Sequence, residues 1–200
     1  MPAQRIILWR HGRTAWNVDG RLQGQTDIEL DPVGHWQART AAAMLASEQR
    51  PTLVISSDLQ RALATAREYS AIGGALPVAD PALRERSFGQ WEGLDRDTIK
   101  NQWPHEYAQW HSGNDANGIP PGGETRATCA HRLTTAITYH ADGLSDNQSL
   151  LVVSHGAAIT LALTALLGND PTNWRGISGL HNAHWSIIDR ARPGTHPHWR

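Results

Sequence analysis

Residues 6–12 read IILWRHG: four apolar residues followed by an arginine, a histidine and a glycine. A short run that is apolar at every position is typical of a strand covered on both faces, as central strands of parallel sheets are. The run stops at Arg10 and His11, which are therefore predicted to lie at the carboxyl end of the strand. In open α/β sheets this is the end beyond which ligands bind.

Two further apolar runs, Leu53–Ile55 and Leu150–Val153, predict two more buried strands. Between and after them the spacing predicts helices. One starts near Asp31-Pro32, with Asp as the cap and Pro in the first turn. The apolar residues expected to face inward from this helix are Val33, Trp36, Met44 and Leu45. A second helix follows the cap chemistry of residues 56–58 and turns Leu59, Ala62, Leu63 and Ala66 to one side. The remaining predicted elements are a loop with a short helix over 83–101, helices over 124–140 and 157–167, and a last strand over 184–188.

This alternation of strands and helices predicts an α/β fold: a three-layer sandwich with a mostly parallel central sheet flanked by helices. Two hundred residues are the length of one ordinary domain. We assign residues 1–189 to that domain and treat residues 112–123, rich in Gly, Pro and Asn, as a loop within it. Residues 190–200 have no periodic pattern and are predicted to form a flexible tail.

Charge and cysteine content exclude several classes of function. The chain has 18 Lys and Arg against 19 Asp and Glu, a net charge of -1, which argues against a protein that coats nucleic acid or an anionic membrane. Cys129 is the only cysteine, so neither an internal disulfide nor a cysteine-based zinc site is expected, in keeping with a cytoplasmic protein. The apolar residues 150–167 approach the length of a membrane span, but Ser154-His155-Gly156 interrupts them, and a strand, a turn and a helix explain them better.

The three strand ends carry similar chemistry. Arg10 and His11 follow the first strand, Arg61 follows the second after a turn, and His155 follows the third. Parallel strands bring these ends to one edge, where two arginines and two histidines would form a compact cationic pocket. Lys100 is the only lysine, so 17 of the 18 basic residues are arginines. The simpler explanation of that excess is the base composition of the genome. The functional explanation is that some arginines bind phosphate with two parallel hydrogen bonds.

The motifs along the chain resemble those of the histidine phosphatases, the phosphoglycerate mutase-like superfamily. Residues 10–17 match the signature R-H-G-x-[ST]-x-x-N, and residues 56–62 match S-S-D-x-x-R-A. Similar segments follow in the family's order, at residues 21–24, 83–93, 122–125 and 154–156.

The resemblance implies a role for each matching residue. His11 would attack phosphorus and form a phosphohistidine, for which its ring must be neutral. Glu85 would protonate the leaving alcohol and then activate water. Arg10, Arg61 and His155 would bind the phosphoryl oxygens and stabilise the transition state. The remaining substrate-binding candidates are Asn17, Gln23, Gly24 and Gly156. The resemblance implies neither a cofactor nor a metal.

Within the superfamily the sequence favours hydrolysis. Mutases resembling this family carry E-R-H-Y-G, where residues 85–89 read E-R-S-F-G, so the parts expected to grip a second acidic group are lacking. We therefore predict a phosphatase acting on a small phosphorylated metabolite. The alternatives are a cofactor-dependent phosphoglycerate mutase and a non-catalytic sensor of a phosphorylated ligand.

The substrate stays open at this point. The pattern L-R-E…G-x-W-x-G-L resembles glucosyl-3-phosphoglycerate phosphatases, while a broad-specificity phosphatase or an α-ribazole phosphatase also fits. Trp91, Trp103 and Trp110 lie in the segment expected to cover the site, where they would either pack or stack on a substrate ring. Arg84 and Arg86, beside Glu85, are expected in solvent, although Arg86 or Arg96 could also meet a second carboxylate. The sequence leaves the oligomeric state open, a homodimer included.

Overall fold

The three apolar runs form the three central strands of a five-stranded sheet. The computed structural model describes residues 3–112 and 120–200, so that 113–119 of the predicted loop 112–123 lie outside the described residues. The strands are β1 (Arg5–Arg10), β2 (Leu53–Ser56), β3 (Pro77–Ala79), β4 (Ser149–Ser154) and β5 (Trp185–Asp189). Their order across the sheet is β3-β2-β4-β1-β5.

The register brings the functional strand ends level with one another. Strands β1 and β4 are parallel, with Arg10 opposite Ser154. Strand β2 is parallel to β4, with Ser56 opposite Val153. Strand β3 continues the parallel part, and β5 alone runs antiparallel, along the other side of β1. The residues after β1, β2 and β4 therefore emerge at the same edge of the sheet.

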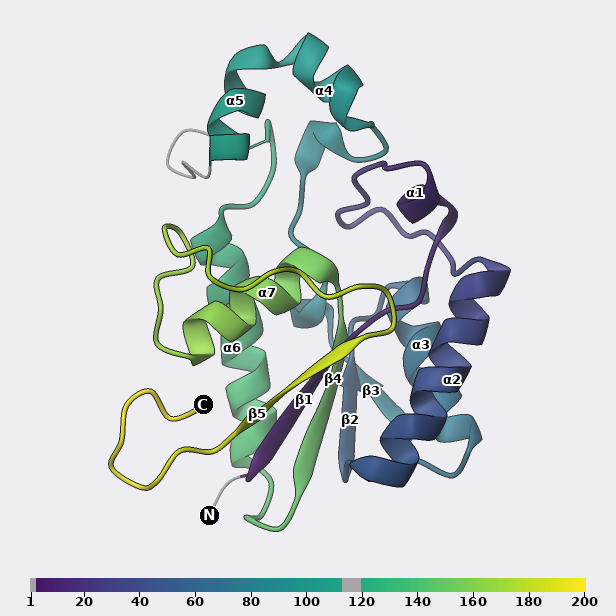
Figure 1. Cartoon of the computed structure of the whole chain (residues 1–200), viewed down its shortest axis with the longest axis vertical. Helices are drawn as coiled ribbons and strands as arrows, with labels where there is room; N and C mark the ends of the chain where they lie inside the picture. Colours follow the sequence, from purple (N-terminus) through teal and green to yellow (C-terminus); the bar gives the residue numbers. More distant parts are fainter. Residues whose placement is uncertain (1–2, 113–119) are drawn as a thin grey trace.

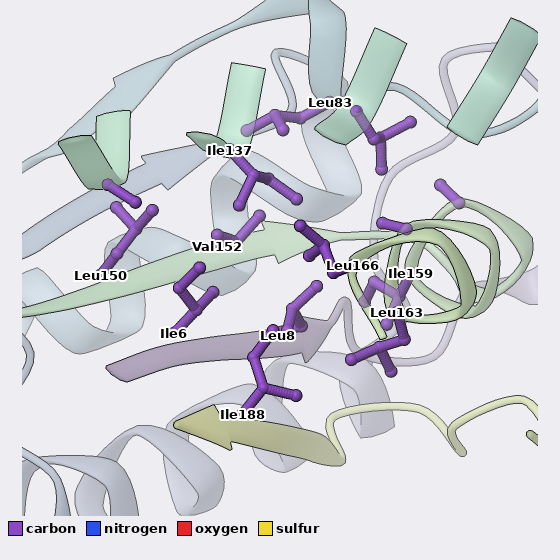
Figure 2. Close-up of a cluster of buried hydrophobic side chains, with 14 of the residues drawn as sticks. Ile6, Leu8, Leu83, Ile137, Leu150, Val152, Ile159, Leu163, Leu166 and Ile188 are labelled. Atoms are coloured by element: carbon purple, nitrogen blue, oxygen red, sulfur yellow. The ribbon is translucent and has the colours of Figure 1, made fainter. Parts of the chain in front are cut away.

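Helices cover both faces of this sheet, as Figure 1 shows. Helices α2 (Pro32–Glu48) and α3 (Gln60–Ala71) lie on one face, and α6 (Arg126–Asp142) and α7 (Gly156–Leu166) on the other. Successive side chains of a strand point to opposite faces: Ile7 and Trp9 pack toward α2 and α3, whereas Ile6 and Leu8 pack toward α6 and α7. Figure 2 shows the second cluster, with Leu150 and Val152 of β4 beside them. The predicted three-layer α/β sandwich is confirmed.

Short elements lie beyond the carboxyl ends of the parallel strands. They are α1 (Ala15–Val18), α4 (Arg96–Gln102), α5 (Pro104–Ser112) and two single-turn 3-10 helices, Pro81–Leu83 and Gly89–Trp91. Trp91 is fully buried here, with its ring centroid 6.5 Å from that of Trp103 and 5.8 Å from that of Trp110. These tryptophans therefore pack against one another in a small separate core beneath α4 and α5.

Helix α2 corrects one sequence prediction. It begins at Asp31-Pro32 as expected, and the Asp31 side chain accepts a hydrogen bond from the Gly34 N–H. Of the four residues expected inside, however, only Leu45 is buried; Val33, Trp36 and Met44 are exposed. The prediction was wrong because the buried face of the helix is made of small residues, namely Gly34, Ala38, Ala41, Ala42 and Leu45. Small side chains let the helix lie close to the sheet and leave the large ones outside.

Residues 190–200 turn back along β5. Asp189 and Arg200 exchange two backbone hydrogen bonds of 3.0 Å, and the buried Trp199 packs on the core beneath the Arg190 guanidinium. These contacts hold the two ends of the segment; the flexibility of the residues between them stays a prediction.

The described part of the chain contains no helix that is both long and apolar enough to cross a bilayer. Residues 150–167 instead form most of β4, a turn and α7, as the polar interruption predicts.

Candidate functional site

His11 follows β1 directly and is 2% exposed. Its Nδ1 lies 2.6 Å from the carbonyl oxygen of Gly12. A carbonyl only accepts hydrogen bonds, so Nδ1 carries the proton and Nε2 keeps its lone pair. Burial first, and then the charges of Arg61 and Arg10, hold the pKa of His11 well below its usual value. The ring is therefore neutral and has a nucleophilic nitrogen.

His155 follows β4 and is fully buried, its ring centroid 5.1 Å from that of His11. The Arg61 Nε–H donates to His155 Nδ1 over 3.1 Å. A guanidinium has no acceptor, so this Nδ1 is unprotonated and the proton sits on Nε2, which lies 2.9 Å from Ser57 Oγ. Burial, followed by the charge of Arg61, lowers the pKa of His155 as well. His155 thus contacts His11 and Arg61 while both of its ring nitrogens are engaged by the protein.

Arg61 lies in the first turn of α3 and is fully buried. Besides the bond to His155, its Nη1 donates to the Thr26 carbonyl over 2.8 Å and its Nη2 to the Gly24 carbonyl over 2.7 Å. Burial lowers the pKa of Arg61 to about 10, which still leaves it charged at neutral pH. Three of the five guanidinium N–H groups are used in this way, so one remains on each terminal nitrogen, a pair suited to two oxygens of a phosphate.

Arg10, the last residue of β1, is the second arginine of this site. Its Nη1 donates to the Leu180 carbonyl. Its buried Nε has no hydrogen-bond partner within the described residues. Burial lowers the pKa of Arg10. A buried cationic N–H without an acceptor is costly, and an anion in the site would satisfy it.

Glu85 is buried at the amino end of α7. Its Oε1 accepts hydrogen bonds from the Ala158 N–H (2.7 Å) and the Arg86 N–H (2.9 Å), and its Oε2 accepts one from Ala157 (3.1 Å). The first turn of a helix leaves its backbone N–H groups without partners inside the helix, and Glu85 supplies the acceptor for two of them. The side chain is thereby fixed at the edge of the site.

Asn17 and Gln23 turn their amide oxygens into the protein. Asn17 Oδ1 accepts from the Thr14 N–H and from Asn182 Nδ2, each over 3.1 Å. Gln23 Oε1 accepts from the Thr14 hydroxyl over 3.1 Å. The donating NH₂ groups are therefore the ends of these two side chains that suit a phosphoryl oxygen.

Glu92 organises the loop that holds Arg61. Its carboxylate accepts hydrogen bonds from the backbone N–H groups of Gln25, Thr26 and Phe88 and from the Thr26 hydroxyl, over 2.8–3.1 Å. Gly24 adopts φ +52, and a Cβ there would lie 2.1 Å from Glu92 Oε1, so glycine is required. The sequence motif contains Glu92, but its partners in this loop, Gln25 and Thr26, lie 67 and 66 residues away in the chain, so residue spacing alone gives no sign of this role.

These residues surround a cavity of about 350 Å³. Of the predicted site residues, those that line it are Arg10, His11, Asn17, Gln23, Gly24, Arg61, Glu85 and Gly156. His155 lies behind this wall, against Arg61.

The sequence predictions for the two neighbours of Glu85, Arg84 and Arg86, have different outcomes. The prediction that Arg86 lies in solvent was wrong: it is 2% exposed, lines the cavity and donates from Nε to the Glu124 carbonyl over 2.7 Å. Arg84 is partly exposed and pairs with Asp58.

The described residues contain no group of three or more histidine, cysteine, aspartate or glutamate side chains arranged to hold a metal ion. That the chemistry here needs no metal stays an implication of the sequence resemblance.

A buried neutral histidine, a buried arginine and a half-buried one at the carboxyl edge of an α/β sheet define a phosphoryl-transfer class of site. The model of the histidine phosphatase superfamily (branch 1) matches residues 6–198, and the chain belongs to that family.

Individual relatives are similar over nearly the whole chain. The glucosyl-3-phosphoglycerate phosphatase of Mycolicibacterium vanbaalenii is 36% identical over 92% of this chain and 84% of its own length. A protein of Yersinia enterocolitica named as a probable phosphoglycerate mutase is 35% identical over the same shares of the two chains. The solved mycobacterial glucosyl-3-phosphoglycerate phosphatase with VO3 superposes with a TM-score of 0.87 at 34% identity, covering 98% of this chain and 96% of that one. Named phosphatases match in both sequence and structure, which supports a phosphatase over a mutase.

Proposed function

We propose that this chain hydrolyses the phosphomonoester of a small metabolite through a phosphohistidine at His11 Nε2. The observation that carries the proposal is the hydrogen bond from His11 Nδ1 to the Gly12 carbonyl, because it leaves Nε2 as the nucleophile. His11 lines the same cavity as Arg10 and Arg61.

In the first step, the lone pair of Nε2 forms a bond to phosphorus while the ester P–O bond breaks. The departing alkoxide takes a proton from the Glu85 carboxyl group. Arg10 and Arg61 neutralise the charge that gathers on the phosphoryl oxygens, with the amide groups of Asn17 and Gln23 as neutral donors. Losing one such donor typically costs about 10²–10³ in rate.

In the second step, Glu85 takes a proton from water, the water oxygen attacks phosphorus and the N–P bond breaks. Inorganic phosphate leaves and His11 is again neutral. No second substrate is needed, so hydrolysis is complete with water alone.

The proposed activity is tested with p-nitrophenyl phosphate. We expect wild type to turn it over and His11→Ala to lose turnover by at least about 10³-fold, since the covalent route is removed. His35→Ala, which alters an exposed histidine on α2, is the matched control and keeps the wild-type rate. The N–P bond of a phosphohistidine breaks in acid, so the phosphorylated protein is isolated under alkaline conditions. A His11→Ala variant with near-normal rate, or a wild type without turnover, would contradict the proposal.

For the substrate we propose a phosphorylated metabolite with a sizeable group beyond the phosphate, and glucosyl-3-phosphoglycerate as the first compound to assay. The similar mycobacterial enzymes support this choice by their names. A second cavity of about 250 Å³ also adjoins the first, and the two share Arg86, Phe88, Arg126 and Ala157. The assay compares released phosphate with that from phosphoserine and 3-phosphoglycerate. Efficient conversion of 3-phosphoglycerate to its isomer would instead favour a mutase.

A further inference from the structure

Ser57 is not one of the residues that line the cavity of about 350 Å³. It is fully buried in the turn between β2 and α3. The sequence predicts that this turn caps α3, but the helix begins at Gln60, and the residue at the cap position, Leu59, makes no side-chain bond. The Ser57 hydroxyl instead lies 2.9 Å from His155 Nε2. It also accepts a longer hydrogen bond, of 3.3 Å, from the Leu59 N–H.

The direction of each bond around His155 follows from chemistry. Arg61 Nε can only donate, so His155 Nδ1 must accept. The ring is neutral and its proton is therefore on Nε2, which leaves Ser57 Oγ as the acceptor. Ser57, His155 and Arg61 thus form one chain of hydrogen bonds, which ends at the guanidinium that lines the cavity.

From this geometry, and resting on the proposed function, we propose that Ser57 is a positioning residue for phosphoryl transfer. By accepting the Nε2 proton it fixes the tautomer and ring orientation of His155, and His155 in turn fixes Arg61 through Nε. The remaining two ties of Arg61, to the Gly24 and Thr26 carbonyls, come from a different loop.

The same chain predicts what happens when the hydroxyl is removed. In Ser57→Ala the buried Nε2–H loses its acceptor, and an unsatisfied buried donor is costly. The ring can regain a partner only by turning or by moving its proton, and either change removes the acceptor from Arg61 Nε. Hydrogen bonds one step removed from a histidine ligand are worth about 10- to 100-fold in activity at metal sites, and we expect a kcat loss of that size here.

The experiment compares Ser57→Ala, Ser57→Thr and Ser56→Ala. Ser56 is an equally buried neighbour whose hydroxyl donates to the Ser57 carbonyl over 2.9 Å, away from the site, so its variant is the matched control. Nitrogen-15 spectra of the histidine rings report the tautomer, and assays with p-nitrophenyl phosphate give kcat and KM. Circular dichroism confirms that each variant is folded.

We expect Ser57→Ala to lose the Nε2–H tautomer of His155 and about 10- to 100-fold in kcat, with a smaller change in KM. Ser56→Ala keeps both the tautomer and the rate, and Ser57→Thr, which retains the hydroxyl, recovers most of the rate. A loss of the Leu59 bond alone would lower stability but leave the ring signals and kcat unchanged. That result, or equal kcat losses in folded Ser57→Ala and Ser57→Thr, would overturn the proposal. If wild type hydrolyses nothing, the proposed function fails, while the ring signals still test the Ser57–His155–Arg61 chain.

Discussion

A histidine ring carries its proton on either nitrogen, and in this site the choice is made twice, in opposite senses. His11 faces a carbonyl, which can only accept, so its Nδ1 is protonated. His155 faces a guanidinium, which can only donate, so its Nδ1 is bare. Two rings with centroids 5.1 Å apart therefore differ in tautomer: His11 has its lone pair on Nε2, and His155 has its lone pair on Nδ1, against Arg61.

The neutrality of both rings has a consequence for stability at acid pH. In the unfolded chain a histidine titrates near 6.5, whereas burial holds the pKa of His11 and of His155 well below that value in the native state. Below pH 6.5 the unfolded state therefore binds more protons, and stability falls as the pH falls from 6.5 toward the lowered native pKa values. The limiting slope is about 1.4 kcal/mol per pH unit for each histidine. Above pH 6.5 this contribution is complete and constant.

Urea unfolding at pH 7.5, 6.5 and 5.5 checks this expectation. We predict that wild type loses stability more steeply below pH 6.5 than His11→Asn, which retains only one of the two buried rings. Carboxylates are common to both proteins and cancel in the comparison. Parallel curves for the two proteins would show that His11 does not resist protonation.

A residue at the carboxyl end of a buried parallel strand is expected at one known edge of the sheet. This expectation predicts the site residues Arg10, His11, Arg61 and His155. Motif resemblance adds Glu85. Neither source predicts the hydrogen bonds that make these residues work. Ser57 contacts His155, 98 residues away in sequence, and Glu92 contacts Gln25 and Thr26, 67 and 66 residues away. Such partnerships depend on the packing of whole elements and leave no local pattern.

At the scale of elements, α2 shows how close packing overrides helix propensity. Glycine in a helix interior is typically about 1 kcal/mol worse than alanine, yet Gly34 lies in the first turns of α2. A Cβ on Gly34 would come 2.0 Å from the Arg13 carbonyl oxygen, in the segment that follows His11. The missing side chain therefore lets α2 rest directly on the segment that follows β1.

We predict that Gly34→Ala destabilises the protein by about 1–3 kcal/mol, the usual range for overpacking, despite the better helix propensity of alanine. Gly143→Ala is the matched control: its Cβ would lie 3.6 Å from the nearest atom, and we expect a change within about 0.5 kcal/mol. Urea denaturation of the two variants measures both values. A neutral or stabilising Gly34→Ala would mean that α2 can move away without cost.

A residue pattern predicts a helix or strand correctly when only one kind of element is compatible with it. The continuous apolar runs become β1, β2 and β4 because both faces of those strands are covered. Strand β3 is missed because its three residues lie at an edge and are mostly exposed. The antiparallel direction of β5 depends on how the chain returns past β1, and the inner face of α2 depends on small residues that a search for large apolar ones overlooks.

For the whole molecule, a net charge of -1 conceals a local concentration of positive charge. The buried Arg61 and the half-buried Arg10 line one cavity, and each loses hydration there. An anion that binds the folded protein alone stabilises it by about 2.7 kcal/mol at 100 times its Kd. For a chain of this size that amounts to roughly 5–10 °C in Tm.

Inorganic phosphate is the direct probe of this effect. We expect it to raise Tm in a saturable way, and sodium chloride at matched ionic strength to leave Tm nearly unchanged. Equal shifts with both salts would indicate general screening, with no phosphate site involved.

The position of β1 in the sheet also sets an order of events during synthesis. β1 is the first strand made, yet its partners are β4, which begins at Ser149, and β5, which ends at Asp189. The strand that precedes His11 must therefore wait for most of the chain to leave the ribosome before it can pair. Contacts so distant in sequence form slowly, and a nascent chain that has already exposed Arg10 and His11 has no phosphate pocket until β4 arrives. Catalysis is thus available only to a protein that has finished folding.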